Sequence, residues 1–134
     1  MNNLILLAED DEDDYLILRD AFGECPLDVE LARVRDGEEL LEYLEKAPLL
    51  PSIILLDLNM PRKDGREALK EIKSNEKWRH IPVVALTTSN MQSDVRHVYQ
   101  LGAANFIRKP SSYSEMLRAI AAFQDYWFKV SLLP

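Results

Sequence analysis

Four separated groups of polar residues are the part of this sequence that could carry out chemistry. They are the acidic run Glu9-Asp10-Asp11, the acid Asp57, the pair Thr87-Thr88, and Lys109. Clustered carboxylates are the hard oxygen ligands that divalent cations bind, and a hydroxyl and an ammonium can contact a phosphoryl oxygen. These residue types indicate a site for a divalent metal ion and a phosphoryl group, provided that the fold brings the four groups together.

The segments before these groups explain how they could meet. Continuous apolar runs precede the first three groups, at residues 4–8, 53–56 and 83–86, and the shorter pair Phe106-Ile107 precedes Lys109. Such runs are typical of strands buried on both faces, as in a parallel sheet. In open α/β sheets the functional crevice lies at the carboxyl ends of the strands. We therefore expect a single site at that edge of the sheet.

Strand-like and helix-like segments alternate along the whole chain. The expected strands are 4–8, 29–34, 53–57, 82–87 and 104–108. The expected helices are 11–24, 36 to before Pro48, one that includes Ala68, Leu69 and Ile72, 93–101, and 111 to about 129. Segment 29–34 alternates apolar and polar residues, which places it at a sheet edge. This order predicts a doubly wound α/β fold with right-handed crossovers.

Length and composition limit the class of protein. A chain of 134 residues is large enough for a core but too short for two domains, so we expect one domain over residues 1–134. The formal net charge of −7 argues against binding to nucleic acid or to an anionic membrane. Cys25 is the only cysteine, which fits a reducing compartment. Without a membrane-spanning run or a signal-peptide pattern, the expected location is the cytoplasm.

The four groups and their spacing also resemble a known family. The acidic pair, Asp57, Thr87 and Lys109-Pro110 resemble the site of a two-component response-regulator receiver domain, and the match covers residues 4 to about 125. Within receivers, segments 86–89 and 126–134 are similar to single-domain regulators paired with cyanobacterial and bacterial phytochromes. The resemblance implies a flavodoxin-like five-stranded sheet of order 2-1-3-4-5 with five helices. It also implies a single receiver domain whose C-terminal helix and tail extend over about 123–134.

For the reaction, the resemblance implies that Asp57 accepts a phosphoryl group from a sensor histidine kinase, with a phytochrome as the narrower candidate. Mg²⁺ would be bound directly by Asp10 and Asp57 and by the backbone carbonyl of Asn59, with Glu9 holding a ligand water. Lys109 would contact a phosphoryl oxygen. Such a protein is a phosphoacceptor rather than an enzyme, with at most slow self-catalysed phosphorylation and dephosphorylation.

For the response, the resemblance assigns the Thr87 hydroxyl a hydrogen bond to the phosphoryl group after its transfer. Phe106 takes the place of a rotating aromatic residue that swings inward as Thr87 moves. Asn59 and Ser89 are the positions expected to set the lifetime of the phosphoryl group.

The acidic run contains more carboxylates than a metal pair needs, so the metal ligands have to be distinguished from the acids of the following helix. By register, Glu9 and Asp10 lie at the end of the first strand, whereas Asp11 is expected to cap the following helix. Asp13 and Asp14 fall in the first turn of that helix, where its dipole favours negative charge. We therefore expect these last two residues to be unimportant for metal binding and phosphorylation.

Other chemistries fit the same residues less well. A haloacid-dehalogenase-like phosphatase needs a second acid two residues after its nucleophile, and here that position is Asn59. An EF-hand loop starting at Asp57 would place Pro61 at a ligand position, and a P-loop motif is missing from the sequence. A pseudo-receiver that binds partners without phosphorylation is the remaining alternative, although every active-site position is filled.

The last expected helix carries a dense group of aromatic residues. Phe123, Tyr126, Trp127 and Val130 share one face at helical spacing. Phe123 is expected to cover the core, whereas Tyr126, Trp127 and Phe128 are expected to contact a second copy of the chain. The sequence thus predicts a homodimer through the fourth helix, the fifth strand, the fifth helix and the tail, and Phe123 is counted among the residues of this surface. The downstream protein stays unknown.

Overall fold

A computed structural model describes residues 3–24, 28–88, 92–130 and 133, and it contains one parallel five-stranded sheet. The strands are β1 (Leu4–Ala8), β2 (Glu30–Val34), β3 (Ile53–Asp57), β4 (Val83–Thr87) and β5 (Asn105–Arg108). They lie in the order β2-β1-β3-β4-β5, so the predicted fold class and strand order are confirmed. All four strand pairs are parallel. The carboxyl ends of the strands therefore meet at one edge of the sheet.

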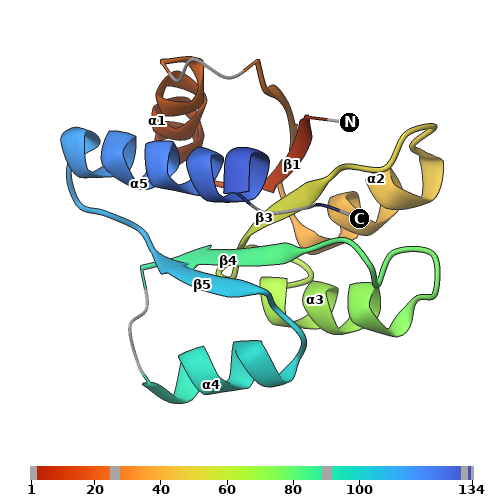
Figure 1. Ribbon diagram of the computed structural model, residues 1–134. Helices are drawn as coiled ribbons and strands as arrows, with labels where there is room; N and C mark the ends of the chain where they lie inside the picture. Colours follow the sequence, from red (N-terminus) through yellow and green to blue (C-terminus); the bar gives the residue numbers. More distant parts are fainter. Residues whose placement is uncertain (1–2, 25–27, 89–91, 131–132, 134) are drawn as a thin grey trace.

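Helices cover both faces of the sheet (Figure 1). They are α1 (Glu12–Gly23), α2 (Gly37–Lys46), α3 (Gly65–Ser74), α4 (Gln92–Gln100) and α5 (Tyr113–Asp125), and a π-helical turn, Tyr126–Val130, continues α5. Helices α1 and α5 lie on one face, and α2, α3 and α4 lie on the other. Side-chain oxygens at four helix starts accept backbone N–H groups and fix where those helices begin; the capping residues are Asp11, Asp36, Asp64 and Ser112.

The core has two layers separated by the sheet. In β1, Leu6 and Ala8 pack toward α2, α3 and α4, while Ile5 and Leu7 pack toward α1 and α5. Strands β3 and β4 alternate in the same way, and β1, β3 and β4 are buried along their whole length. This two-sided burial explains their continuous apolar sequences. Strand β2 is more exposed and lies at the sheet edge, as predicted.

The aromatic residues after α5 differ from the prediction. Trp127 is only 9% exposed and packs in the layer that includes Ile5 and Leu7. It lies four residues after the buried Phe123 and therefore on the same helix face, which is turned toward the core. Phe128 is partly buried against the same layer, whereas Tyr126 is 53% exposed. Burial argues against the expected contact of Trp127 with a second copy, whereas the contact expected for Tyr126 is compatible with its exposure and stays a prediction.

Among the helices of the described ranges, none combines the length and the apolar character that crossing a membrane requires.

Candidate functional site

The fold gathers the predicted polar residues at the carboxyl edge of the sheet. Glu9 and Asp10 directly follow β1, Asp57 is the last residue of β3, and Thr87 is the last residue of β4. Lys109 follows β5, and its backbone N–H donates to the Thr87 carbonyl at 2.7 Å. The neighbouring parallel strands thus bring together residues that are far apart in the sequence.

Lys109 is the centre of the charge network at this edge. Its side chain is 8% exposed, and its Nζ lies 2.6 Å from Glu9 Oε1, 2.8 Å from Asp14 Oδ2 and 3.3 Å from Asp57 Oδ2. Burial lowers the pKa of Lys109, but the bonds to Asp14 and Glu9 and the charge of Asp57 outweigh this effect, so the pKa lies above its usual value. Lys109 is therefore a permanent cation that orders three carboxylates.

Glu9 shows the cost of bringing these acids together. Its side chain is fully buried, and its Oε2 accepts the backbone N–H of Asp11 at 3.3 Å. Burial raises the pKa of Glu9 to about 8; a bond to Asp57 adds to this increase, and Lys109 opposes it. In the metal-free site the Glu9 carboxyl therefore tends to keep its proton near neutral pH. A cation that enters the site has to displace this proton.

The acidic residues also fit a divalent metal ion. One carboxylate oxygen from each of Glu9, Asp10 and Asp57 lies within 4.8 Å of the other two. Asp10 is exposed while Glu9 and Asp57 are buried, so the group opens to solvent on one side. These ligands are hard anionic oxygens, which suit Mg²⁺ or Mn²⁺ better than softer metals. The contribution of the Asn59 backbone carbonyl stays a prediction.

Asn59 connects Asp57 to Thr87. Its backbone N–H donates to Asp57 Oδ1 at 3.0 Å, and its side-chain Nδ2 donates to Thr87 Oγ1 at 3.0 Å. Thr87 is fully buried, whereas Thr88 is exposed. Thr87 Oγ1 is the acceptor in this bond, so the bond does not use the hydroxyl's own proton.

The loop after Asp57 is held close to the strand by a glycine at the start of α3. Gly65 N–H donates to the Leu58 carbonyl at 3.0 Å. A Cβ atom at Gly65 would lie 2.5 Å from the Asp57 carbonyl oxygen, which is closer than packing allows. Only glycine lets the start of α3 pack directly behind Asp57.

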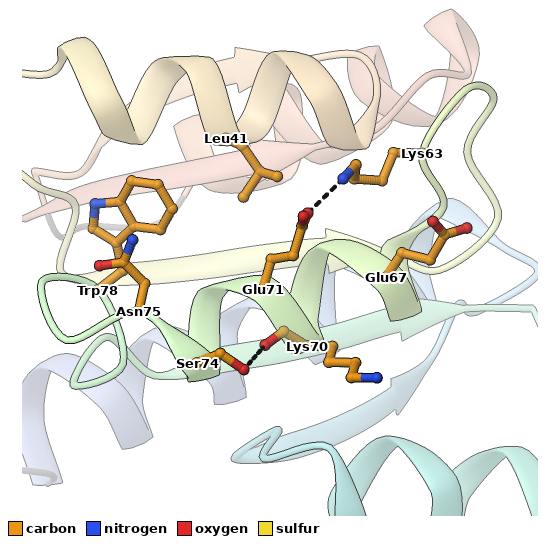
Figure 2. Close-up of a pocket in the computed structure, with 8 residues that line it drawn as sticks. All are labelled: Leu41, Lys63, Glu67, Lys70, Glu71, Ser74, Asn75 and Trp78. Atoms are coloured by element: carbon orange, nitrogen blue, oxygen red, sulfur yellow. Dashed lines mark hydrogen bonds and ion pairs between the residues drawn. The ribbon is translucent and has the colours of Figure 1, made fainter.

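A pocket of about 220 Å³ opens over these residues, and it is lined by Asp10, Asp11, Asp14, Asp57, Asn59, Thr88 and Lys109. A larger open groove of about 670 Å³ lies between α2 and α3 (Figure 2). That groove is crossed by an ion pair of 2.6 Å between Lys63 and Glu71, and Trp78 lies at one end of it. It shares no residue with the pocket at the strand ends, which is where the predicted chemistry lies.

The other predicted residues lie in different places. Phe106 is half-buried on β5, two residues before Arg108, which pairs with Thr87. Its backbone N–H donates to the Tyr99 hydroxyl at 3.2 Å, which joins α4 to the edge of the sheet. Ser89 lies outside the described residues. The aromatic residues 123–128 belong to the far part of α5 and its π-helical turn, away from the pocket.

Asp14 is a residue of this pocket that the sequence interpretation left out. It was assigned only to the helix dipole, but its carboxylate also contacts Lys109 directly, so its expected unimportance for metal binding and phosphorylation stays a prediction. A weaker signal was present: Asp14 lies in the first turn of α1, directly after the acidic loop that follows β1. Asp11 has the predicted capping role, since its Oδ1 accepts the Asp14 N–H at 2.9 Å.

Comparisons with known proteins agree with this geometry. The profile of the response regulator receiver domain matches residues 5–121. Response regulator Rcp1 from Synechocystis sp. is 36% identical, and the alignment covers 98% of this chain and 92% of Rcp1.

Two solved structures are similar over almost their whole length. The phosphorylated cyanobacterial phytochrome response regulator RcpA has a TM-score of 0.94 at 35% identity, covering 100% of this chain and 99% of RcpA. The Mn²⁺-bound form of Rcp1 has a TM-score of 0.90 at 34% identity, covering 98% of this chain and 99% of the other. Together with the strand order and the acidic pocket, these matches show that the chain belongs to the response regulator receiver domain family.

Proposed function

We propose that Asp57 is the residue of this receiver that accepts a phosphoryl group from a histidine kinase, in a reaction that depends on Mg²⁺. The observation that supports this most strongly is the position of the Asp57 carboxylate. It ends a buried strand, contacts Lys109, and is one of three acids whose oxygens converge within 4.8 Å. The similar structures include a phosphorylated regulator and an Mn²⁺-bound one, which also supports the proposal.

The transfer is a displacement at phosphorus. An oxygen of Asp57 attacks the phosphorus of a phosphohistidine, the P–N bond breaks, and its electron pair stays with the imidazole, which takes up a proton. The product is an acyl phosphate. A bound divalent cation supplies charge neutralisation for the acids and the phosphoryl oxygens. Lys109 adds a fixed positive charge beside Asp57 Oδ2, and the Asn59 N–H holds Oδ1, so the carboxylate is oriented before attack.

Phosphorylation then changes the balance of contacts around Thr87. The phosphoryl group adds roughly two negative charges to a pocket that is already acidic. Lys109 and the Thr87 hydroxyl are nearby groups that can donate to its oxygens, and a movement of Thr87 toward them also moves the acceptor of the Asn59 amide. Phe106 lies on the neighbouring strand and follows this movement. The result is a shift between two populations of the face formed by α4 and β5.

The narrower parts of the proposal concern pathway and assembly. The similarity to Rcp1 and RcpA supports a phytochrome-type kinase as donor, and the acidic composition with one cysteine supports a cytoplasmic location. We propose a homodimer in which the exposed Tyr126 contacts the second copy, flanked by the partly buried Phe128. Trp127 and Phe123 support this surface from inside their own chain.

The acceptor is tested by incubation with acetyl phosphate and Mg²⁺, followed by intact mass. The wild type should gain about 80 Da, the mass of one phosphoryl group on an activated carboxylate. Asp57→Asn should gain nothing, and chelation of the metal should prevent labelling of the wild type. Full labelling of Asp57→Asn would refute the assignment.

The dimer is tested separately by light scattering. Tyr126→Ala should shift the protein toward monomer, because aromatic anchors at interfaces typically cost roughly 2 kcal/mol when truncated. Tyr113→Ala is a matched control, since Tyr113 is also exposed but lies at the other end of α5. A wild type that stays monomeric at high concentration would contradict this part of the proposal.

A further inference from the structure

Arg33 is a buried arginine of the edge strand β2 that contacts the loop after β1. Its side chain is 8% exposed. The Nε atom donates to the backbone carbonyl of Glu9 at 3.1 Å, and Nη1 donates to Glu12 Oε2 at 2.7 Å. The guanidinium also lies 4.1 Å from the centre of the Tyr15 ring. Arg33 therefore joins β2, the acidic loop and α1 at one point.

These contacts hold the backbone of Glu9 on both sides. Its N–H donates to the Val34 carbonyl at 3.0 Å, and its carbonyl accepts Arg33 Nε. The peptide bond between Glu9 and Asp10 is planar, so a fixed Glu9 carbonyl also fixes the N–H and Cα of Asp10. Asp10 is the exposed member of the three converging acids, so little packing holds its side chain. The direction of the Asp10 carboxylate therefore depends on the plane of the Glu9–Asp10 peptide.

The buried guanidinium of Arg33 is hard to explain by stability alone. The Nη2 atom of Arg33 is buried and has no hydrogen-bond partner among the residues described. Burying a guanidinium with one nitrogen unsatisfied carries a desolvation penalty that an apolar side chain would avoid. An arginine that lies at this cost beside a cluster of metal-binding acids suggests a role in arranging them.

We propose that Arg33 is a positioning residue of the metal site: it holds the Glu9–Asp10 peptide so that both carboxylates converge with Asp57. The inference rests on the proposed function, because it assumes that these acids bind Mg²⁺. Arg33 does not touch the metal or the phosphoryl group. It acts through the backbone, as residues that orient the ligands of a metal commonly do.

A role of Arg33 through its charge alone and a role in positioning the ligands predict opposite changes in Mg²⁺ affinity when Arg33 is replaced. If Arg33 acted only through its charge, its replacement by an uncharged residue would remove repulsion and tighten Mg²⁺ binding. If Arg33 positions the ligands, the same replacement weakens binding. Arg33→Met keeps an apolar stem of similar length and removes the guanidinium. Arg19→Met is the matched control, because Arg19 is 54% exposed on α1 and the change in charge is the same.

The experiment measures Mg²⁺ binding to the whole chain by isothermal titration calorimetry. We expect Arg33→Met to weaken binding roughly tenfold or more, the usual loss when a residue that orients metal ligands is removed. Arg19→Met should leave the affinity unchanged or slightly tighter. In phosphorylation by acetyl phosphate, the Mg²⁺ concentration at half-maximal rate should rise for Arg33→Met, while the rate at saturating Mg²⁺ returns close to the wild-type value.

Arg33→Lys provides a second variant in case the methionine variant folds poorly. Lysine keeps the charge but cannot reach Glu9 and Glu12 together, so an intermediate affinity is expected.

Wild-type protein that does not bind Mg²⁺ would refute the proposed function. Wild-type binding with equal or tighter binding by both Arg33 variants would overturn the positioning role alone. A loss that persists at saturating Mg²⁺ would also overturn it, because it would indicate general disruption.

Discussion

Two clusters of charged residues beside the sheet have opposite character. In the first, the buried ammonium of Lys109 contacts three carboxylates, from Glu9, Asp14 and Asp57. In the second, the guanidinium of Arg62 is 56% exposed and pairs with Asp36 and Glu38. The first cluster has more negative than positive charge and lies mostly out of water. In the second, the cation and Glu38 are exposed, and only Asp36, the cap of α2, is buried.

The difference shows which cluster is built for a ligand. Buried carboxylates that outnumber their cation destabilise the fold until another cation binds, so the Lys109 cluster has a reason to bind metal. An ion pair with a solvent-exposed cation contributes only about 0–1 kcal/mol, so we expect the Arg62 cluster to do little beyond holding a loop.

The ion pairs of Arg62 with Asp36 and Glu38 hold the loop that follows Asp57. Arg62 has a φ of 63°, in the left-handed region. Gly37 N–H donates to the Lys63 carbonyl at 2.9 Å, and a Cβ at Gly37 would lie 2.3 Å from that oxygen. The loop is thus anchored on the start of α2, while the chemistry stays with the buried cluster.

The largest effect should come from removing the carboxylate of Asp57, the proposed acceptor, from the Lys109 cluster. Asp57→Asn should abolish phosphorylation by acetyl phosphate. In the absence of metal it should also raise Tm by a few degrees, roughly the effect of 1 kcal/mol, because one of the crowded negative charges is gone. Calorimetry in the presence of a chelator measures this change. An unchanged or lower Tm would mean that the cluster is not under electrostatic strain.

The next comparison separates acids within the same cluster. Asp10→Asn should weaken Mg²⁺ binding by more than roughly tenfold, the loss already typical of residues that only orient ligands. Asp14→Asn should leave Mg²⁺ binding within a few-fold but slow phosphorylation several-fold, since Lys109 loses a partner at 2.8 Å. Asp13→Asn is the exposed control and should change neither quantity. Equal behaviour of Asp13→Asn and Asp14→Asn would deny Asp14 a part in the site.

The raised pKa of Glu9 predicts a dependence of stability on pH in the metal-free protein. The pKa is about 8 in the folded chain against 4.5 ordinarily, so the folded state binds more protons between these values. The stability that Glu9 contributes is fully present below pH 4.5 and is lost as the pH rises through 8. Wild type should therefore lose about 1 kcal/mol or more between pH 5 and pH 8 relative to Glu9→Gln.

Urea unfolding of both proteins in the presence of a chelator measures this loss. Mg²⁺ should reverse it, because the cation replaces the proton among the carboxylates. Parallel pH profiles for wild type and Glu9→Gln would show that Glu9 is not protonated at neutral pH.

The smallest effects are expected in the exposed cluster. Arg62→Ala should change the free energy of unfolding by less than about 1 kcal/mol and the phosphorylation rate by less than roughly twofold. Arg62→Gly loses the same ion pairs. Glycine adopts the left-handed backbone conformation of this position without steric strain, so Arg62→Gly should be more stable than Arg62→Ala. A large loss of phosphorylation in either variant would show that the two clusters are coupled through the loop.

Much of this molecule could be predicted from its sequence. The continuous apolar runs of β1, β3 and β4 predicted a parallel sheet, because only strands buried on both faces need apolar residues at every position. The sheet then placed Glu9, Asp10, Asp57, Thr87 and Lys109 at one edge without any further information. Local backbone chemistry also fixed the helix start at Asp11, whose side chain bonds the N–H of a residue three positions away.

The tertiary structure alone decided which side chains touch. The Lys109–Asp14 pair spans 95 residues, and the Arg33–Glu9 contact joins β2 to the loop after β1. Burial separated Trp127 from Tyr126, although they are adjacent and both aromatic. Backbone hydrogen bonding and apolar periodicity are local and can be followed along a chain. The partner of a charged or aromatic side chain depends on its rotamer and on the few ångströms between elements, which are settled only when the whole domain packs.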